Sequence, residues 1–409
     1  MTRSYARSAL VVGVLLAAGC DSSSAIIGGT GGGGGRTTPM TGTGGSGGAP
    51  PSQGSGGSAG SGGNGGLPDT GITGADVPGT TVDASDAPPG DVTVVPGMRR
   101  HGKSAGCGMA PGAAGAQQLS IPVCTGCSAA MGNCPRDCIA PEFAPGGASV
   151  VGGQNFTSRS YSFRLPAGYQ PDTPYPVFLG GSGCGGGASG YNPNATGAIT
   201  VALAILTGNH PDGSCFADGG IACSGTAANI PLCVNGPEMA YVRGILSYLE
   251  SHFCVDLDRE FIGGVSSGAW EATTRGCGDA DQLRGFVSVA GGKREHRWPC
   301  TGPIAAFMIA DTGDSGNPIG PLATINTPSL DSFGSGPQRD ELLVRNGCQG
   351  KATAVYDPAY PLCVKYTGCP AAYPVVWCEL HGGHVQTSEG GINYSNAIWP
   401  FFKSLPLPP

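Results

Sequence analysis

The sequence predicts an α/β fold with a mostly parallel central sheet, helices on both faces and many disulfides. Three observations predict it. Short apolar segments alternate with segments of helical periodicity over residues 151–409, a sharp glycine turn joins a strand to a helix, and the chain has 17 cysteines. Strands that alternate with helices form parallel βαβ units, and the sheet that they build is buried on both faces.

The composition is uneven along the 409 residues. Many of the 75 glycines fall in the first hundred residues, where too few apolar side chains occur to offset the entropy of ordering the backbone. We therefore expect a disordered Gly/Ser/Pro-rich tether over residues 20–100, a Cys-rich lead-in over residues 101–150 and the main folded domain over residues 151–409. The net charge is -7 and no basic stripe is visible, which argues against nucleic-acid binding.

The first twenty residues have the pattern of an export signal. Arg3 and Arg7 precede an apolar run at residues 9–18 that is too short to span a bilayer permanently. The run ends in Leu-Ala-Ala-Gly-Cys, which resembles a bacterial lipobox. That resemblance implies a lipoprotein signal peptide over residues 1–19 and a lipidated Cys20 that anchors the exported chain to a membrane. The alternative is an ordinary signal peptide followed by a coincidental cysteine.

Removing Cys20 leaves 16 cysteines, an even number. In an exported chain such a count predicts disulfides, although the sequence does not give their connectivity. The alternative is a zinc site in the lead-in, because Cys124 and Cys127 are followed by Cys134 and Cys138 at spacings that suit zinc. We favour disulfides, and we expect no metal or organic cofactor.

The predicted elements begin after the lead-in. Residues 159–165 alternate between polar and apolar positions, as a half-buried strand does, and residues 238–253 carry apolar side chains at helical spacing. Short continuous apolar runs predict buried strands, and amphipathic or proline-initiated stretches predict helices. The other expected strands are residues 176–179, 198–206, 261–262, 285–290, 304–309 and 375–378, and the other expected helices are residues 269–275, 337–344 and 394–402.

Residues 264–268 read Gly-Val-Ser-Ser-Gly, between a predicted strand and a predicted helix. In that context the pattern G-x-S-x-G places the Ser266 hydroxyl at the tip of a very tight turn, where it can act as a nucleophile. The backbone N–H of Ser267 would then face a developing oxyanion. The rival interpretations are a purely structural turn and Ser267 as the nucleophile, but the framing glycines favour Ser266.

A serine hydroxyl needs a general base. Two of the six histidines follow a late strand in the motif His-Gly-Gly-His, at positions 381 and 384. Loops at the carboxyl ends of strands carry the sites of α/β folds. His384 is the preferred base, and His381 is the alternative.

The third member of a triad is an acid that orients the histidine. In this chain it should lie between Ser266 and His384, just after a strand. Asp314 follows the predicted strand at residues 304–309 and is our choice, with Asp311 as the alternative. The alternative for both aspartates is a structural turn cap.

A glycine-rich run at residues 180–187 follows another strand and would let backbone N–H groups approach a substrate oxygen. The run lacks the Lys-Ser/Thr of a phosphate-binding loop, so we reject a nucleotide site.

From residue 102 onward the chain resembles bacterial secreted esterases of the polyhydroxybutyrate depolymerase and feruloyl esterase group, which are related to carbohydrate esterase family 1 and have the α/β-hydrolase fold. The resemblance implies hydrolysis of carboxylic esters by a catalytic domain at residues 151–409, with Ser266, Asp314 and His384 as the triad and the N–H groups of Cys184 and Ser267 as oxyanion donors. The matching stretches are residues 104–108, 175–177, 182–185, 248–256, 259–268 and 375–384.

Three stretches depart from the family. The oxyanion turn has Ser182 where the family usually has histidine, residues 310–313 replace a His-Gly, and Ala269-Trp270 replaces Gly-Met. No catalytic group is lost, so we expect an active enzyme, acting as a monomer on feruloyl or acetyl esters of polysaccharide or on short hydroxyalkanoate polyesters. The alternative is a catalytically inactive surface-binding lipoprotein on the same fold.

Overall fold

A computed structural model describes most of the chain from residue 100 onward. The described residues are 81–82, 100–128, 134–141, 144, 155–183, 190–205, 207–209, 215–217, 237–293, 300–319, 334–348 and 353–407. The chain divides into two units, Met1–Thr73 and Gly74–Pro409, and all described residues belong to the second. The predicted signal peptide, Cys20 and most of the predicted tether lie outside them.

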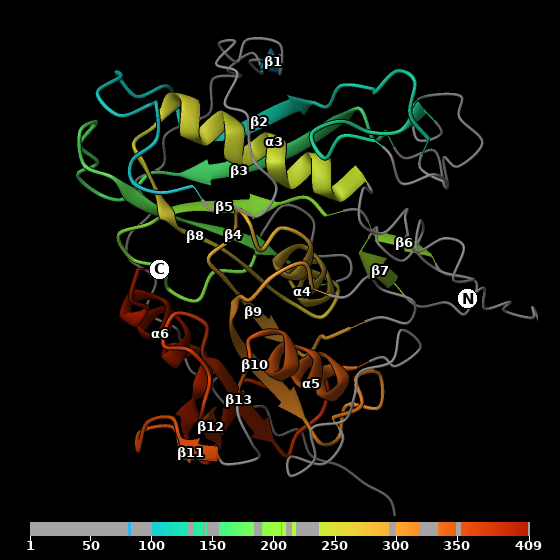
Figure 1. Ribbon diagram of the computed structural model, residues 1–409, viewed down its shortest axis with the longest axis vertical. Helices are drawn as coiled ribbons and strands as arrows, with labels where there is room; N and C mark the ends of the chain where they lie inside the picture. The colour runs from blue at the N-terminus through green and yellow to red at the C-terminus, as the bar shows by residue number, and fades with distance from the viewer. Residues whose placement is uncertain are drawn as a thin grey trace, which may run out of the picture. The chain divides into compact units, whose positions relative to one another are not determined.

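The second unit is built on an eleven-stranded sheet with the order β1-β2-β3-β5-β4-β8-β9-β10-β13-β12-β11 (Figure 1). The six central strands, from β5 to β13, are all parallel, and antiparallel strands flank them on each side. The strands are β1 (Thr81–Val82), β2 (Gly115–Ser120), β3 (Ser158–Arg164), β4 (Tyr175–Gly181), β5 (Ile199–Leu203), β8 (Val255–Val265), β9 (Gly285–Val289), β10 (Ala305–Asp311), β11 (Thr353–Val355), β12 (Cys363–Tyr366) and β13 (Val375–Leu380).

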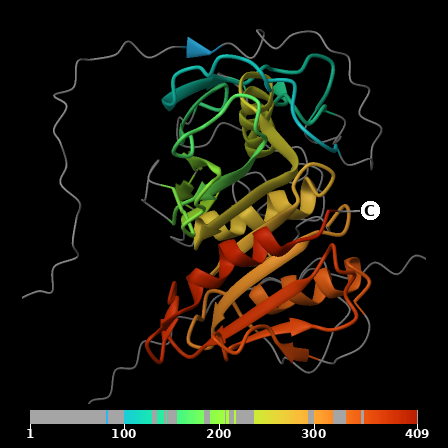
Figure 2. The same ribbon diagram turned by 90° about the vertical axis from the view of Figure 1, so that its left-hand side faces the viewer.

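Helices cover both faces of the sheet. Alternate residues of a strand point to opposite faces, and β10 shows this directly. Its residues Ala306 and Met308 pack with α3 (Pro237–His252), α4 (Ser267–Gly278) and α5 (Ser335–Arg345), whereas Phe307 and Ile309 pack with α6 (Ile398–Ser404). In Figure 2, α5 and α6 accordingly lie on opposite sides of the C-terminal strands.

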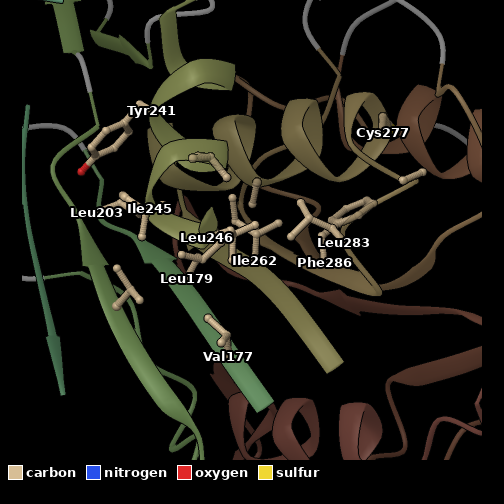
Figure 3. Close-up of a cluster of buried hydrophobic side chains, with 14 of the residues drawn as sticks. Val177, Leu179, Leu203, Tyr241, Ile245, Leu246, Ile262, Cys277, Leu283 and Phe286 are labelled. Carbon is tan, nitrogen blue, oxygen red and sulfur yellow. The ribbon is translucent and has the colours of Figure 1, made fainter. Parts of the chain in front are cut away.

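The larger core lies between the sheet and α3. Apolar side chains of α3, such as Ile245 and Leu246, meet Leu179 of β4 and Ile262 of β8 (Figure 3). All four are fully buried. Burying side chains of this size contributes about 1.5–3 kcal/mol each relative to exposure. This packing fixes the central strands whose ends carry the polar residues described below.

Every strand and helix predicted for residues 159–402 is present, with shifted ends. The predicted C-terminal helix begins as a 3-10 turn, Tyr394–Ala397, and continues as α6. Short pairs of strands that the sequence did not indicate are β6 (Thr207–Asn209) with β7 (Cys215–Ala217), and β14 (Ser388–Glu389) with β15 (Ile392–Asn393).

The Cys-rich lead-in takes part in the same fold. It contributes β2, which pairs with β3, and its Cys107 is bonded to Cys254 at the start of β8. The four cysteines of the alternative zinc site form two disulfides instead, Cys124–Cys138 and Cys127–Cys134. Three further disulfides join Cys277–Cys300, Cys348–Cys369 and Cys363–Cys378. The prediction of a disulfide-rich chain is confirmed.

Among the described helices, none has both the length and the apolar character that crossing a bilayer requires.

Candidate active site

Four neighbouring parallel strands, β8, β9, β10 and β13, have their carboxyl ends together at one side of the sheet. Val265, the last residue of β8, is in register with Val289 of β9, and Asp311, the last residue of β10, is in register with Leu380 of β13. Parallel strands expose their carboxyl ends at the same edge, where α/β folds place their ligand sites. Ser266, Asp314 and His384 follow β8, β10 and β13 by only a few residues, so the topology brings them together.

Ser266 occupies a strained turn. Its φ of 53° and ψ of -118° lie outside the ordinary helical and extended regions. Its N–H donates to the carbonyl of Val289 at 2.9 Å, while its carbonyl accepts from the N–H of Ala269 at 2.9 Å in the first turn of α4. A non-glycine residue held in such a conformation is typical of functional sites, because the surrounding structure must enforce the strain.

The two glycines that frame Ser266 are required by close backbone contacts. A Cβ atom at Gly264 would lie 2.3 Å from the backbone of Gly268, and one at Gly268 would lie 2.2 Å from the carbonyl oxygen of Gly181. Both distances are far inside van der Waals contact. The G-x-S-x-G pattern therefore reflects the packing of the turn against its own helix and against the end of β4.

The side chains of the three predicted residues form one hydrogen-bonded chain. The Oγ of Ser266 lies 2.8 Å from Nε2 of His384, and Nδ1 of His384 lies 2.8 Å from Oδ2 of Asp314. The side chain of Asp314 is 4% exposed and that of His384 is 47% exposed. A buried acid, an imidazole and a hydroxyl in this order can move a proton from the hydroxyl to the imidazole.

The loops that carry the acid and the histidine are hydrogen bonded to each other. The N–H of Thr312 donates to the carbonyl of Leu380 at 2.8 Å, and the N–H of Gly313 donates to the carbonyl of Gly382 at 3.0 Å. A Cβ at Gly313 would lie 2.3 Å from that Gly382 oxygen, so the approach needs a glycine. The spacing between Asp314 and His384 is thus fixed by backbone contacts.

The two alternative residues, His381 and Asp311, are not part of this hydrogen-bonded chain. Nδ1 of His381 contacts Oε1 of Glu389 at 2.8 Å, and its side chain is 62% exposed. Asp311 is buried, and burial raises the pKa of its carboxyl to about 6; the neighbouring Asp314 acts in the same direction, while backbone N–H groups of Gly382 and Gln386 act against it. It is Asp314, and not Asp311, that hydrogen bonds His384.

The predicted oxyanion donors are only partly described. Ser267 is the first residue of α4 and is buried directly beside Ser266. In the loop after β4, a Cβ at Gly183 would lie 3.4 Å from Cβ of Ser266, so this loop reaches the nucleophile. Cys184, the other predicted donor, lies outside the described residues.

Two residues at the site were not predicted from the sequence. The side chain of Asn317 donates to Oδ2 of Asp314 at 2.9 Å, and Nε1 of Trp270 donates to Oδ1 of Asn317 at 2.7 Å. The backbone N–H of Gly316 adds a bond to Oδ1 of Asp314 at 3.0 Å. The only sequence signal for Asn317 was its position three residues after the predicted acid.

In the part of the chain that the structure describes, no group of three or more His, Cys, Asp or Glu side chains is placed to hold a metal ion.

Comparison with known proteins identifies relatives over about three fifths of the chain. No family model matches the chain. It is 24% identical over 261 residues to feruloyl esterase C of Emericella nidulans, covering 62% of this chain and 87% of the relative. It is 25% identical over 267 residues to feruloyl esterase D of Neurospora crassa, covering 63% and 86%. The solved acetyl xylan esterase of Aspergillus awamori superposes with a TM-score of 0.41 at 13% identity, over 60% of this chain and 94% of that one. These similarities support a feruloyl esterase-like α/β-hydrolase.

Proposed function

We propose that the protein is an exported serine esterase that hydrolyses carboxylic esters through an acyl-enzyme. The observation that carries this proposal is the hydrogen-bonded chain from Ser266 through His384 to Asp314, with 2.8 Å at each contact. Ser266 lies on a strained turn directly after the carboxyl end of β8, where a substrate carbonyl can approach its hydroxyl. The similarity to proteins named feruloyl esterases supports the same class of reaction.

We propose a role for each residue, and the hydrogen bonds support it. Asp314 accepts from Nδ1–H of His384, which leaves Nε2 as the acceptor that faces the hydroxyl of Ser266. As Oγ attacks the ester carbonyl, Nε2 takes its proton and then gives it to the departing alcohol. The buried carboxylate of Asp314 stabilises the imidazolium formed in between. Water then attacks the carbonyl of the acyl-enzyme while Nε2 of His384 takes its proton. The proton passes to Oγ of Ser266 as the carboxylic acid leaves.

The oxyanion of each tetrahedral intermediate needs hydrogen-bond donors. We assign this role to the backbone N–H groups of Ser267, the first residue of α4, and of Cys184, which lies outside the described residues. Removal of one such donor typically costs about 3 kcal/mol of transition-state stabilisation.

The proposed substrates are feruloyl or acetyl esters of polysaccharide, or short hydroxyalkanoate polyesters. The names of the curated relatives favour the feruloyl esters. Tryptophan side chains can stack on a substrate ring. Of the four in the chain, Trp377 and Trp399 are buried in the two cores, and Trp298 lies outside the described residues. Trp270 is partly buried on α4 and its indole N–H is engaged by Asn317.

The test compares hydrolysis of para-nitrophenyl acetate and methyl ferulate by the full, oxidised chain and by Ser266→Ala. Ser288→Ala is the matched control, because Ser288 is a buried serine of β9 outside the hydrogen-bonded chain. We expect activity in the wild type and the control and none in Ser266→Ala, and the ratio of the two rates ranks the substrates. A folded wild type without activity on either ester would favour the binding lipoprotein instead.

We further propose that Cys20 is lipidated and anchors the exported protein to the cell envelope. The lipobox-like sequence supports this, and the six disulfides among the described residues are typical of proteins that fold in an oxidising compartment. Metabolic labelling with a radioactive fatty acid should mark the wild type and not Cys20→Ser. Equal labelling of both proteins, or labelling of neither, would contradict the anchor.

A further inference from the structure

Asn317 is a buried side chain with three hydrogen bonds to three different parts of the site. It is 2% exposed. Its Oδ1 accepts from Nε1 of Trp270 at 2.7 Å, and its Nδ2 donates to Oδ2 of Asp314 at 2.9 Å and to the carbonyl of Ala290 at 3.1 Å. The amide therefore uses both of its hydrogens, and its oxygen is engaged as well.

The orientation of the amide is determined by its partners. An indole N–H can only donate and a backbone carbonyl can only accept. Trp270 thus fixes the position of the amide oxygen, and Ala290 fixes the position of the nitrogen. With these two contacts in place, an amide hydrogen must face the carboxylate of Asp314.

These partners connect Asp314 to the elements that hold the nucleophile. Trp270 lies on α4, whose first turn hydrogen bonds the carbonyl of Ser266. Ala290 follows β9, and its neighbour Val289 accepts from the N–H of Ser266 at 2.9 Å. Asn317 therefore ties the acid to the same two elements that set the position of the serine.

Both carboxylate oxygens of Asp314 accept hydrogen bonds. Its Oδ2 accepts from both His384 and Asn317, and its Oδ1 accepts from the N–H of Gly316. Without the amide, the carboxylate can rotate about its side-chain bond, and the acceptor for Nδ1–H of His384 is no longer fixed. Misplacement of a catalytic group by such small movements lowers the rate more than the affinity.

We infer that Asn317, held in turn by Trp270, is the positioning residue for the catalytic acid. The inference rests on the proposed serine esterase mechanism and deepens it. Neither Asn317 nor Trp270 exchanges protons with the substrate.

The test is a double-mutant cycle on the full chain with para-nitrophenyl acetate, using Asn317→Leu, Trp270→Phe and the double variant. Asn317→Leu should lower kcat about 10–100-fold with KM unchanged, as loss of a residue that orients a catalytic group typically does. Trp270→Phe removes one hydrogen bond and should lower kcat about 3–10-fold. Because Trp270 acts through Asn317, the double variant should match Asn317→Leu alone.

Two remote variants control for general loss of packing. Asn346 is a buried asparagine that hydrogen bonds the backbone of Ile304 and Tyr373, near the amino ends of β10 and β13. Nε1 of Trp399 donates to the carbonyl of Thr196 at 3.0 Å. Asn346→Leu and Trp399→Phe should lower the melting temperature without changing kcat.

Several results would overturn the inference: wild-type kcat in Asn317→Leu, a fully additive double variant, or equal losses of kcat in the controls. If Ser266→Ala is inactive and Asn317→Leu is fully active, only the positioning role fails, whereas activity in Ser266→Ala removes the proposed function itself. A second readout needs no turnover. The deshielded Nδ1–H proton resonance of His384 should be visible in the wild type and in the controls but lost or broadened in Asn317→Leu, and an unchanged resonance would also overturn the inference.

Discussion

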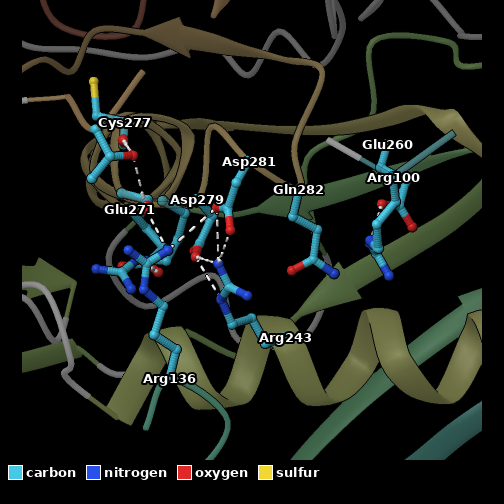
Figure 4. A network of polar contacts seen from close by, with 12 residues as sticks. Arg100, Arg136, Arg243, Glu260, Glu271, Cys277, Asp279, Asp281 and Gln282 are labelled. Carbon is cyan, nitrogen blue, oxygen red and sulfur yellow. Dashed lines mark hydrogen bonds and ion pairs between the residues drawn. The ribbon is translucent and has the colours of Figure 1, made fainter. Parts of the chain in front are cut away.

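The protein has two polar networks that differ in whether their side chains can exchange protons. The network at the carboxyl edge joins Ser266, His384, Asp314 and Asn317. The other lies at the end of α4, where Nε of Arg243 donates to Asp279 at 2.6 Å and Nη2 donates to Asp281 at 3.0 Å (Figure 4). Both networks join segments that are distant in sequence.

The difference lies in what their protons can do. Arginine stays protonated, so the second network consists of permanent charges that neutralise each other and hold α3, α4 and the following loop together. The first network contains an imidazole that is nearly half exposed and lies between an acid and a hydroxyl on a strained turn. Breaking the first should therefore affect the reaction, and breaking the second should affect stability.

The largest effect on the reaction is expected for Ser266→Ala. The substitution removes the nucleophile, so kcat/KM for para-nitrophenyl acetate should fall by a factor on the order of 10⁴ or more. The alanine leaves the rest of the turn in place, so the thermal unfolding midpoint should stay near that of the wild type. A variant that loses stability in parallel with activity would place Ser266 among the structural residues.

Asp314→Asn should be the next most severe change. An amide in place of the carboxylate favours the wrong tautomer of His384 and no longer stabilises the imidazolium, so kcat should fall by about 10³–10⁴-fold. Steady-state rates with the same ester measure this. Asp311→Asn, at the alternative acid, is the comparison, and a greater loss of kcat in that variant would reverse the assignment.

In the arginine network, Asp279→Ala should act on stability alone. Asp279 is 1% exposed, and its loss leaves the partly buried guanidinium of Arg243 with Asp281 as its carboxylate partner. Removal of one partner of a buried pair costs about 3–5 kcal/mol. Urea unfolding should show this loss, with kcat changed less than about twofold at temperatures where the variant is folded. The more exposed Asp281→Asn should cost less, and a large drop in kcat for Asp279→Ala would show that the two networks are coupled.

The smallest expected effect is the pH dependence that Asp311 gives to the free energy of unfolding. Burial raises its pKa to about 6, so the folded protein keeps this proton where the unfolded chain has lost it. Stability from this group therefore falls as pH rises from about 4 to about 6 and stays reduced above that range. Asp311→Asn removes the titration, so the variant should gain stability relative to the wild type as pH rises from about 4 to about 6. Urea unfolding across this range measures the gain, and a difference from wild type that does not change with pH would contradict it.

The sequence predicted the elements in which apolar periodicity is strong, such as α3 and β10, and it failed where polar residues are buried with long-range partners. β8 was expected only at residues 261–262, but it begins at Val255. Its polar first half resembles a loop in sequence, yet Glu260 is fully buried because Arg100, 160 positions earlier, pairs with it at 2.9 Å. Likewise β2 contains few apolar residues and forms by pairing with β3.

In the site, too, residues marked by local sequence were predicted and residues that depend on distant partners were not. Ser266, Asp314 and His384 could be proposed because a local motif or a position after a strand marks each of them. Asn317 and Trp270 could not, because their roles depend on hydrogen bonds between residues 47 positions apart, and nothing local to either residue signals the other.

The central claim is that Ser266 is the nucleophile of an ester hydrolase. It is tested most directly by treating the folded protein with a fluorophosphonate and locating the adduct by peptide mass spectrometry. We expect one adduct per chain, on Ser266, with none in Ser266→Ala and strongly reduced labelling in His384→Ala. Absence of an adduct in the folded wild type, or an adduct on Ser267 that persists in Ser266→Ala, would contradict it.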